Sequence, residues 1–140
     1  MGSWGTASLE SDEGLDVLHA LTEYTTERKS VRLKELIAHF REIGFLSEDP
    51  DEEDFLYDNT AIALAEIVCA YIENGMTKYE QLNGLNEIVL EKEDVLELKQ
   101  LVQQVLDNKG GDRELYELRD GDSDWIKHME NVVRILSERL

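Results

Sequence analysis

Basic residues are scarce in this chain. Its 140 residues include 14 lysines and arginines against 32 aspartates and glutamates, which gives a formal net charge of −18. A field of that sign repels nucleic acid and acidic membranes and favours a basic partner protein. Five of the bases lie between residues 28 and 41, but a patch of that size does not outweigh the overall field. We therefore expect the chain to bind neither nucleic acid nor membrane.

Cysteine and long apolar runs are also nearly absent. The single cysteine, Cys69, excludes an intramolecular disulfide and suits a reducing compartment. The longest apolar run, residues 61–72, is interrupted by Glu66 and falls short of the ~18 residues that a membrane helix needs. No basic region followed by an apolar stretch opens the chain, so no secretory signal is predicted. Residues 1–6 match the loose myristoylation pattern, but residues 1–27 supply no accompanying basic patch. These features predict a cytoplasmic protein.

Proline and glycine are few, with one and nine residues respectively, which argues against a low-complexity chain. Apolar residues make up 41% of the sequence, enough to build a core despite the charge. A chain of this length buries about two thirds of its unfolded surface around one core. We therefore expect one domain over residues 1–140.

Helical periodicity runs through most of the chain. Apolar residues recur at intervals of three and four in six segments, at about 12–28, 30–43, 59–74, 92–108, 112–119 and 123–140. Ser30 is the expected N-cap of the second segment, and Gly44 is its expected end. The third segment is alanine-rich and apolar on nearly all sides, which is typical of the centre of a bundle. The sequence predicts an all-α, single-domain bundle of five to six helices with a buried alanine-rich central helix.

Two connecting segments break this periodicity. Residues 47–58 are predicted to form an acidic loop, because Pro50 disfavours helix at Asp49 and consecutive like charges repel one another. Within the second segment, residues 76–91, the apolar residues 88–90 fit either a short strand or a helical turn. The pattern does not decide between these two.

Short motifs stand near the two ends of the chain. They are residues 1–5 (MGSWG), 11–16 (SDEGLD), 113–118 (RELYEL), Trp125 and 136–140 (LSERL). In these motifs the chain resembles domain-of-unknown-function family 4259, a bacterial family of small acidic proteins that open with Met-Gly-Xaa-Trp-Gly. The resemblance implies an all-helical, bacterial, cytoplasmic protein. It transfers no catalytic residues.

One acidic cluster raises the question of a metal site. Residues 120–124 (DGDSD) have the alternating aspartates that open a calcium-binding loop. Trp125 and Asn131 stand where such a loop needs its glycine and its bidentate glutamate. We interpret the cluster as a turn whose aspartates cap the helix that follows.

The three histidines, His19, His39 and His128, have no metal-binding partner at a convincing spacing. His39 lies four residues after Glu35 and three before Glu42, which indicates a surface ion pair. No metal and no cofactor are predicted.

The apolar third segment contains two residues that carry chemistry. Cys69 is expected to act as a small buried hydrophobe and not as a nucleophile, since no nearby base would lower its pKa. Glu66 places a charge in an apolar helix, so its carboxylate must be paired, exposed or functional. We expect it to pair with an arginine.

The acidic segment combines steering charges with aromatic anchors, as protein-binding surfaces do. The candidate partner-binding residues are Asp51, Glu52, Glu53, Asp54, Phe55, Tyr57 and Asp58. The alternative is a solvated loop whose two aromatic rings are tucked into the domain.

These observations favour a non-enzymatic acidic binding protein. One version is an immunity protein or inhibitor that covers the active site of a basic toxin such as a nuclease, with carboxylates in place of phosphates. One alternative is a metal-dependent hydrolase in which clustered carboxylates bind magnesium or manganese. Another is a structural subunit that packs the stripe of the last helix against a second copy.

Overall fold

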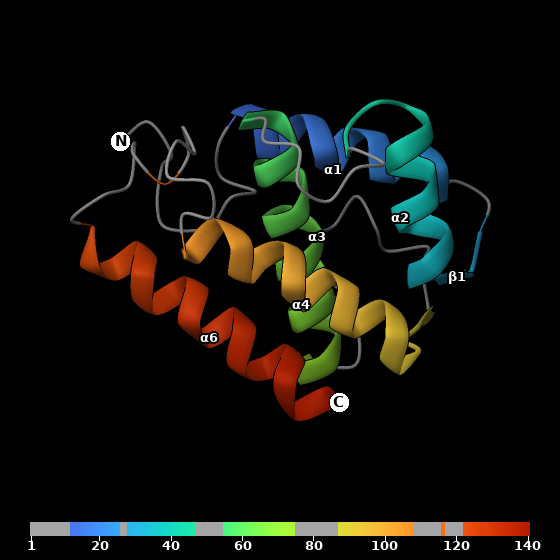
Figure 1. Ribbon diagram of the computed structural model, residues 1–140. Coiled ribbons are helices and arrows are strands. Elements are labelled where there is room, and N and C mark those ends of the chain that lie inside the picture. Colours follow the sequence, from blue (N-terminus) through green and yellow to red (C-terminus); the bar gives the residue numbers. More distant parts are fainter. Residues whose placement is uncertain (1–11, 26–27, 47–54, 75–86, 108–115, 117–121) are drawn as a thin grey trace.

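The computed structural model describes residues 12–25, 28–46, 55–74, 87–107, 116 and 122–140 (Figure 1). The elements in these residues are α1 (Asp12–Thr25), β1 (Ser30–Arg32), α2 (Leu33–Glu42), α3 (Phe55–Asn74), β2 (Glu87–Val89), α4 (Lys92–Leu106) and α6 (Ser123–Arg139). The predicted all-α bundle is confirmed, with one two-stranded parallel sheet added to it.

Helix α3 forms the centre of the bundle, as its composition predicts. Every residue from Ala61 to Ala70 is buried. Helices α1, α4 and α6 all contact α3, and α4 crosses it on the side seen in Figure 1. Each fully buried leucine or isoleucine in this core contributes about 1.5–3 kcal/mol. The alanines of α3 let the neighbouring helices approach closely, because they add little side-chain volume.

Helix α2 ends where the sequence predicts. Gly44 has φ +84°, a left-handed conformation that glycine adopts without a steric penalty. The Gly44 N–H donates to the Arg41 carbonyl at 3.2 Å, and the Phe45 N–H donates to the Phe40 carbonyl at 2.8 Å. The Phe45 ring packs against the Phe40 ring, with centroids 5.8 Å apart. Together these contacts form a Schellman motif.

The N-terminal cap predicted for α2 is wrong. Ser30 lies in β1, which pairs in parallel with β2 in a register that places Val31 beside Ile88. Both of these apolar residues are buried, and their burial holds the two short strands on the core. The Ser30 hydroxyl donates to Glu87 Oε1 at 3.1 Å instead of capping a helix. Of the two conformations left open for residues 88–90, the strand is the one observed over Glu87–Val89.

Helix α3 begins four or five residues earlier than predicted. Phe55 to Asp58 lie in its first turn, although the sequence assigned them to the acidic loop. A carboxylate in the first turn is favoured by the positive end of the helix dipole, which supports helix at Asp58. The rest of that predicted loop, residues 47–54, lies outside the described residues.

Helix α6 presents a stripe of apolar residues to the core, as the periodicity of residues 123–140 predicts. Trp125, Met129, Val132 and Leu136 are buried, whereas Leu140 at the end of the stripe is 37% exposed. The Asp122 side chain caps the helix by accepting a hydrogen bond from the Trp125 N–H at 3.1 Å, which confirms the capping interpretation for this aspartate.

Of the predicted helix over residues 112–119, only Tyr116 is described. Its ring lies edge-on to the Trp125 ring, with centroids 6.3 Å apart. Among the described residues, no helix is long and apolar enough to cross a membrane.

Candidate functional site

The structure describes only part of the partner-binding segment predicted from sequence. Residues 51–54, which hold Asp51, Glu52, Glu53 and Asp54, lie outside the described residues. Phe55 starts α3, Tyr57 is half-buried, and Asp58 is 5% exposed. Partner binding by this segment therefore stays a prediction.

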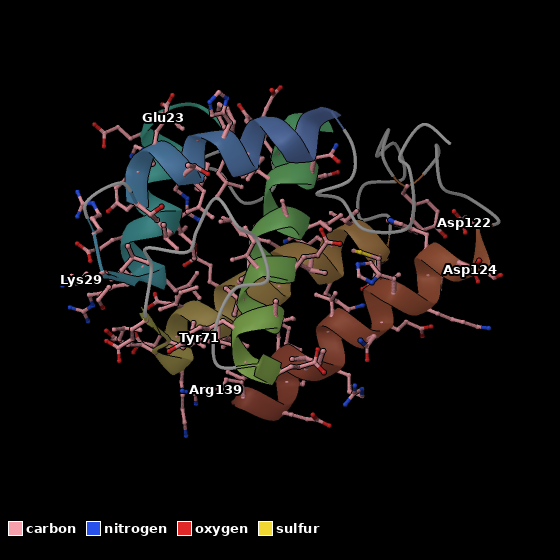
Figure 2. All side chains as sticks on the ribbon, turned by 180° about the vertical axis from the view of Figure 1, so that it is seen from behind. Glu23, Lys29, Tyr71, Asp122, Asp124 and Arg139 are labelled. Atoms are coloured by element: carbon pink, nitrogen blue, oxygen red, sulfur yellow. The ribbon has the colours of Figure 1, made fainter. Side chains whose placement is uncertain are left out.

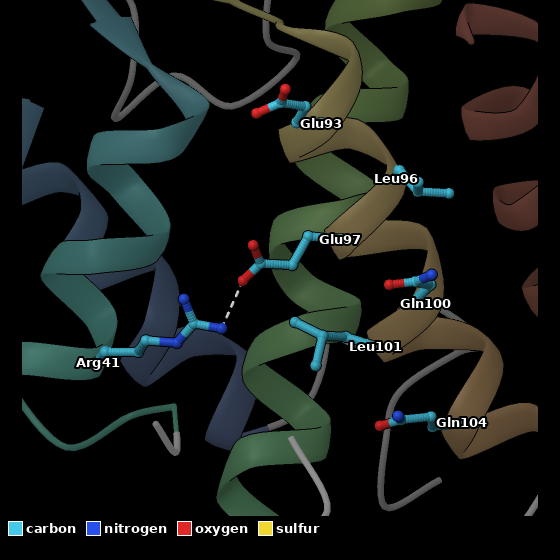
Figure 3. Close-up of a pocket in the computed structure, with 7 residues that line it drawn as sticks. All are labelled: Arg41, Glu93, Leu96, Glu97, Gln100, Leu101 and Gln104. Atoms are coloured by element: carbon cyan, nitrogen blue, oxygen red, sulfur yellow. Dashed lines mark hydrogen bonds and ion pairs between the residues drawn. The ribbon is translucent and has the colours of Figure 1, made fainter. Parts of the chain in front are cut away.

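A pocket of about 370 Å³ lies between α2 and α4, and we call it the α2–α4 pocket (Figure 3). One lining residue, Arg41, comes from the last turn of α2. The other lining residues all come from α4; they are Glu93, Leu96, Glu97, Gln100, Leu101 and Gln104. Sequence reasoning did not identify this pocket as a site.

Helical periodicity explains why one face of α4 lines the pocket. The six α4 residues follow one another at spacings of three, one, three, one and three, which places them on one side of the helix. The opposite side carries Val95, Leu98, Val102 and Val105, which are buried in the core. Leu96, in contrast, is 42% exposed, so the pocket contains apolar surface that solvent reaches.

Charge inside the pocket is mostly negative. The Arg41 guanidinium donates to Glu97 Oε1 across the gap between the helices, and these side chains are 28% and 38% exposed. Glu93 is exposed one helical turn before Glu97. A pair this exposed contributes about 0.2–1 kcal/mol. The carboxylates can accept hydrogen bonds from a cation, and the two glutamines can donate or accept.

A second polar constellation joins α3 to α6. His128 Nε2 lies 2.5 Å from Glu66 Oε2, and the two side chains are 27% and 5% exposed. We expected an arginine beside Glu66, and the contact observed here is with a histidine. One signal could have indicated it: His128 stands three residues after Trp125 and four before Val132, at the border of the buried stripe.

Cys69 lies one turn after Glu66 and behaves as predicted. Its Sγ donates to the Val132 carbonyl at 3.6 Å, and the side chain is buried. Burial raises the pKa of the thiol from 9.0 to about 12, and the nearby carboxylates of Glu73 and Glu66 act in the same direction. Its burial agrees with the predicted role as a packing group.

The predicted surface ion pair of His39 is replaced by a ring contact. Its imidazole lies 4.4 Å from the Tyr24 ring of α1, measured between centroids.

Within the described ranges, no group of three or more histidine, cysteine, aspartate or glutamate side chains could hold a metal ion. The charged and amide side chains that line the α2–α4 pocket suit binding through ion pairs and hydrogen bonds.

Comparison with known families gives one match. Residues 2–130 match the family described as "Domain of unknown function (DUF4259)", in agreement with the resemblance seen at the two ends of the sequence. Comparisons with curated proteins and with solved structures give no match. Because the match spans most of the 140 residues, the chain belongs to the DUF4259 family.

Proposed function

We propose that this chain is a non-enzymatic acidic binding protein that engages a basic protein partner. The observation that carries the proposal is the spread of exposed carboxylates over all five described helices. Examples are Asp16 and Glu23 on α1, Glu35 and Glu42 on α2, Glu73 on α3, Glu93 on α4, and Asp124 and Glu130 on α6. Figure 2 shows Glu23 and Asp124 at opposite ends of the molecule, both at its periphery.

A field of this kind acts mainly on association. Complementary charge speeds the encounter of two proteins and disfavours partners of the same sign. It acts over about 8 Å at physiological ionic strength, so its contribution weakens as salt is added. A partner recognised in this way has a basic surface, and its binding depends on salt.

The specific version of the proposal is an inhibitor or immunity protein for a basic toxin such as a nuclease. A nuclease binds a polyanion, so its active site is surrounded by positive charge. A folded surface with many carboxylates can occupy such a site in place of phosphates. The formal charge of −18 supports this version over an inhibitor of an acidic enzyme.

Affinity capture tests the proposal. The tagged full chain is used as bait in an extract of the cells that produce it, at about 50 mM and about 500 mM salt. The matched control bait carries Glu23→Gln, Glu35→Gln, Glu73→Gln and Glu130→Gln, which changes exposed carboxylates to amides of similar shape. Captured proteins are identified by mass spectrometry, and the purified partner is then titrated by calorimetry at several salt concentrations.

We expect a basic protein that the wild-type bait enriches over the control and that the higher salt concentration releases. The proposal is wrong if the enriched proteins are acidic, if salt does not change their retention, or if nothing is enriched at low salt. The inhibitor version has its own check. When the captured partner cleaves nucleic acid, a saturating amount of the chain should stop the cleavage, and full residual activity would exclude inhibition.

A further inference from the structure

We propose that the α2–α4 pocket binds an arginine side chain of the basic partner. In this arrangement Glu93 and Glu97 pair with the guanidinium, and Leu96 packs against the aliphatic stem. The inference rests on the proposed function and assigns a site to it.

The pocket is large enough to admit one side chain. Its volume of about 370 Å³ is near the lower end of the range for ligand pockets, about 300–1,000 Å³. An arginine has both an apolar stem and a charged planar head, and the pocket offers a surface for each. Leu96, 42% exposed, lies between the two carboxylates in the sequence of α4 and lines the same pocket. In Figure 3 its side chain points to the side of α4 away from Arg41, whereas Glu93 and Glu97 point toward α2.

The pocket already binds a guanidinium, that of Arg41. This group crosses from α2 and donates to Glu97 Oε1 (Figure 3). The Glu97 carboxylate is therefore oriented for a guanidinium in the free protein. Because Glu93 stands one turn earlier on the same face, a second guanidinium that takes the place of Arg41 at Glu97 can use Glu93 as well.

The polar lining favours arginine over lysine. A guanidinium has five N–H donors in a planar fork, whereas an ammonium has three donors at one point. Two carboxylates and the side-chain carbonyls of Gln100 and Gln104 give the fork several acceptors along the pocket. An ammonium can reach fewer of them at once, so it binds more weakly.

Arg41 then acts as an internal competitor for the partner's arginine. It holds Glu97 in the free protein, and releasing a partly exposed pair costs little. Removal of its charge should make binding about threefold tighter, since exposed ion pairs change equilibria by factors of roughly one to five. Arg41 is a specificity-determining residue in this scheme, because it weakens the binding of weakly basic segments.

A titration with a defined probe tests the site. The ¹⁵N-labelled full chain is titrated with acetyl-Gly-Arg-Gly-amide, and the same peptide with lysine or with neutral citrulline serves as comparison. We expect backbone amide shifts concentrated at residues 93–104 and at Arg41, with a dissociation constant on the order of 1 mM. Lysine should bind more weakly, and citrulline should give no measurable shift.

Matched variants separate the pocket from the general field. Glu97→Gln should weaken binding about threefold or more, whereas Glu130→Gln makes the same change of charge on α6 and should leave it nearly unchanged. Arg41→Gln should tighten binding, and Lys127→Gln on α6 is its charge-matched control. Figure 1 shows α6 on the side of α4 away from α2, so both controls lie outside the pocket. Circular dichroism of each variant checks that it is folded.

Two results would overturn the site. One is a set of shifts that avoids residues 93–104; the other is equal weakening by Glu97→Gln and Glu130→Gln, which indicates the general field alone. In both cases the proposed function survives if a basic partner is still captured in a salt-dependent way. Failure of every basic probe at low salt would overturn the site, whereas the proposed function is decided separately by the capture experiment.

Discussion

The contact between Glu66 and His128 should stabilise the fold, and the effect can be measured by removing one side at a time. The carboxylate of Glu66 is 5% exposed, while the imidazole of His128 is 27% exposed. His128→Ala leaves a buried carboxylate without its imidazole. Glu66→Met removes the buried charge and leaves an imidazole that solvent already reaches. The two substitutions break the same contact, but they should lower the free energy of unfolding by different amounts.

The expected loss of stability follows from the burial of the two side chains. A hydrogen bond to a charged group contributes about 1.5–3 kcal/mol, and the partial exposure of His128 places this one near the lower end. We expect His128→Ala to lower the free energy of unfolding by about 2 kcal/mol. At roughly 3 °C per kcal/mol for a chain of this size, Tm should fall by about 6 °C. Glu66→Met conserves volume in an apolar helix and should cost less than about 1 kcal/mol.

Urea and thermal unfolding of a double-mutant cycle measure the contact itself. His128→Ala is made in the wild-type chain and in the Glu66→Met chain, so loss of packing by the imidazole cancels between them. His19→Ala, on the exposed face of α1, is the control for removing a histidine. Equal destabilisation by His128→Ala in both backgrounds would refute the reasoning, because it would mean that the carboxylate and the imidazole are not coupled.

Three further predictions concern single residues. Gly44→Ala should lower the free energy of unfolding by about 1–2 kcal/mol, because alanine is strained in the backbone at φ +84° although no atom stands within 4 Å of the added Cβ. Gly44→Asn should lower it by less when both variants are unfolded in urea, and a larger loss for Gly44→Asn would contradict this. Cys69 in the folded chain should react with a disulfide reagent at pH 8 far more slowly than in urea, since a rise in its pKa from 9.0 to about 12 lowers the thiolate fraction roughly a thousandfold; similar rates in both states would disprove it. Burial raises the pKa of the Asp94 carboxyl above 3.8, so the wild type should lose stability relative to Asp94→Asn as the pH rises above that value. Urea unfolding at several pH values measures this difference, with Asp124→Asn in the exposed first turn of α6 as the control. A gain in the stability of the wild type relative to Asp94→Asn with rising pH would contradict the prediction.

Local patterns predicted most of the helical structure. The buried residues of α2 and α4 follow the three- and four-residue spacing seen in the sequence, and Gly44 ends α2 as expected. These features depend on residues within a few positions of one another. The strand pair does not, because Val31 and Ile88 meet only after the intervening chain has folded. Ser30 was assigned as a cap for the same reason, since its strand partner is far away in sequence.

The pocket and the internal ion pairs were beyond sequence analysis for a related reason. Periodicity shows that Leu96 and Glu97 face away from the core, but it does not show which helix lies across from them. The Arg41–Glu97 contact spans 56 residues and the Glu66–His128 contact spans 62. Spacing places His128 at the border of the buried stripe of α6, but it does not show which residue of another helix lies across from it. The choice between arginine and histidine as the partner of Glu66 depended on such a contact.

The structure also changes the meaning of the basic cluster between residues 28 and 41. Three of its five side chains make internal contacts: Arg28 lies over the Tyr24 ring at 4.4 Å, Arg32 pairs with Glu91, and Arg41 pairs with Glu97. A guanidinium that pairs with a carboxylate of its own chain contributes little to the electrostatic attraction of a phosphate group. These pairs join β1 to the residue before α4, and α2 to the second turn of α4. These three arginines thus serve the fold, and Glu97 of α4 already binds an arginine within the molecule. A basic partner would add one more contact of the same kind.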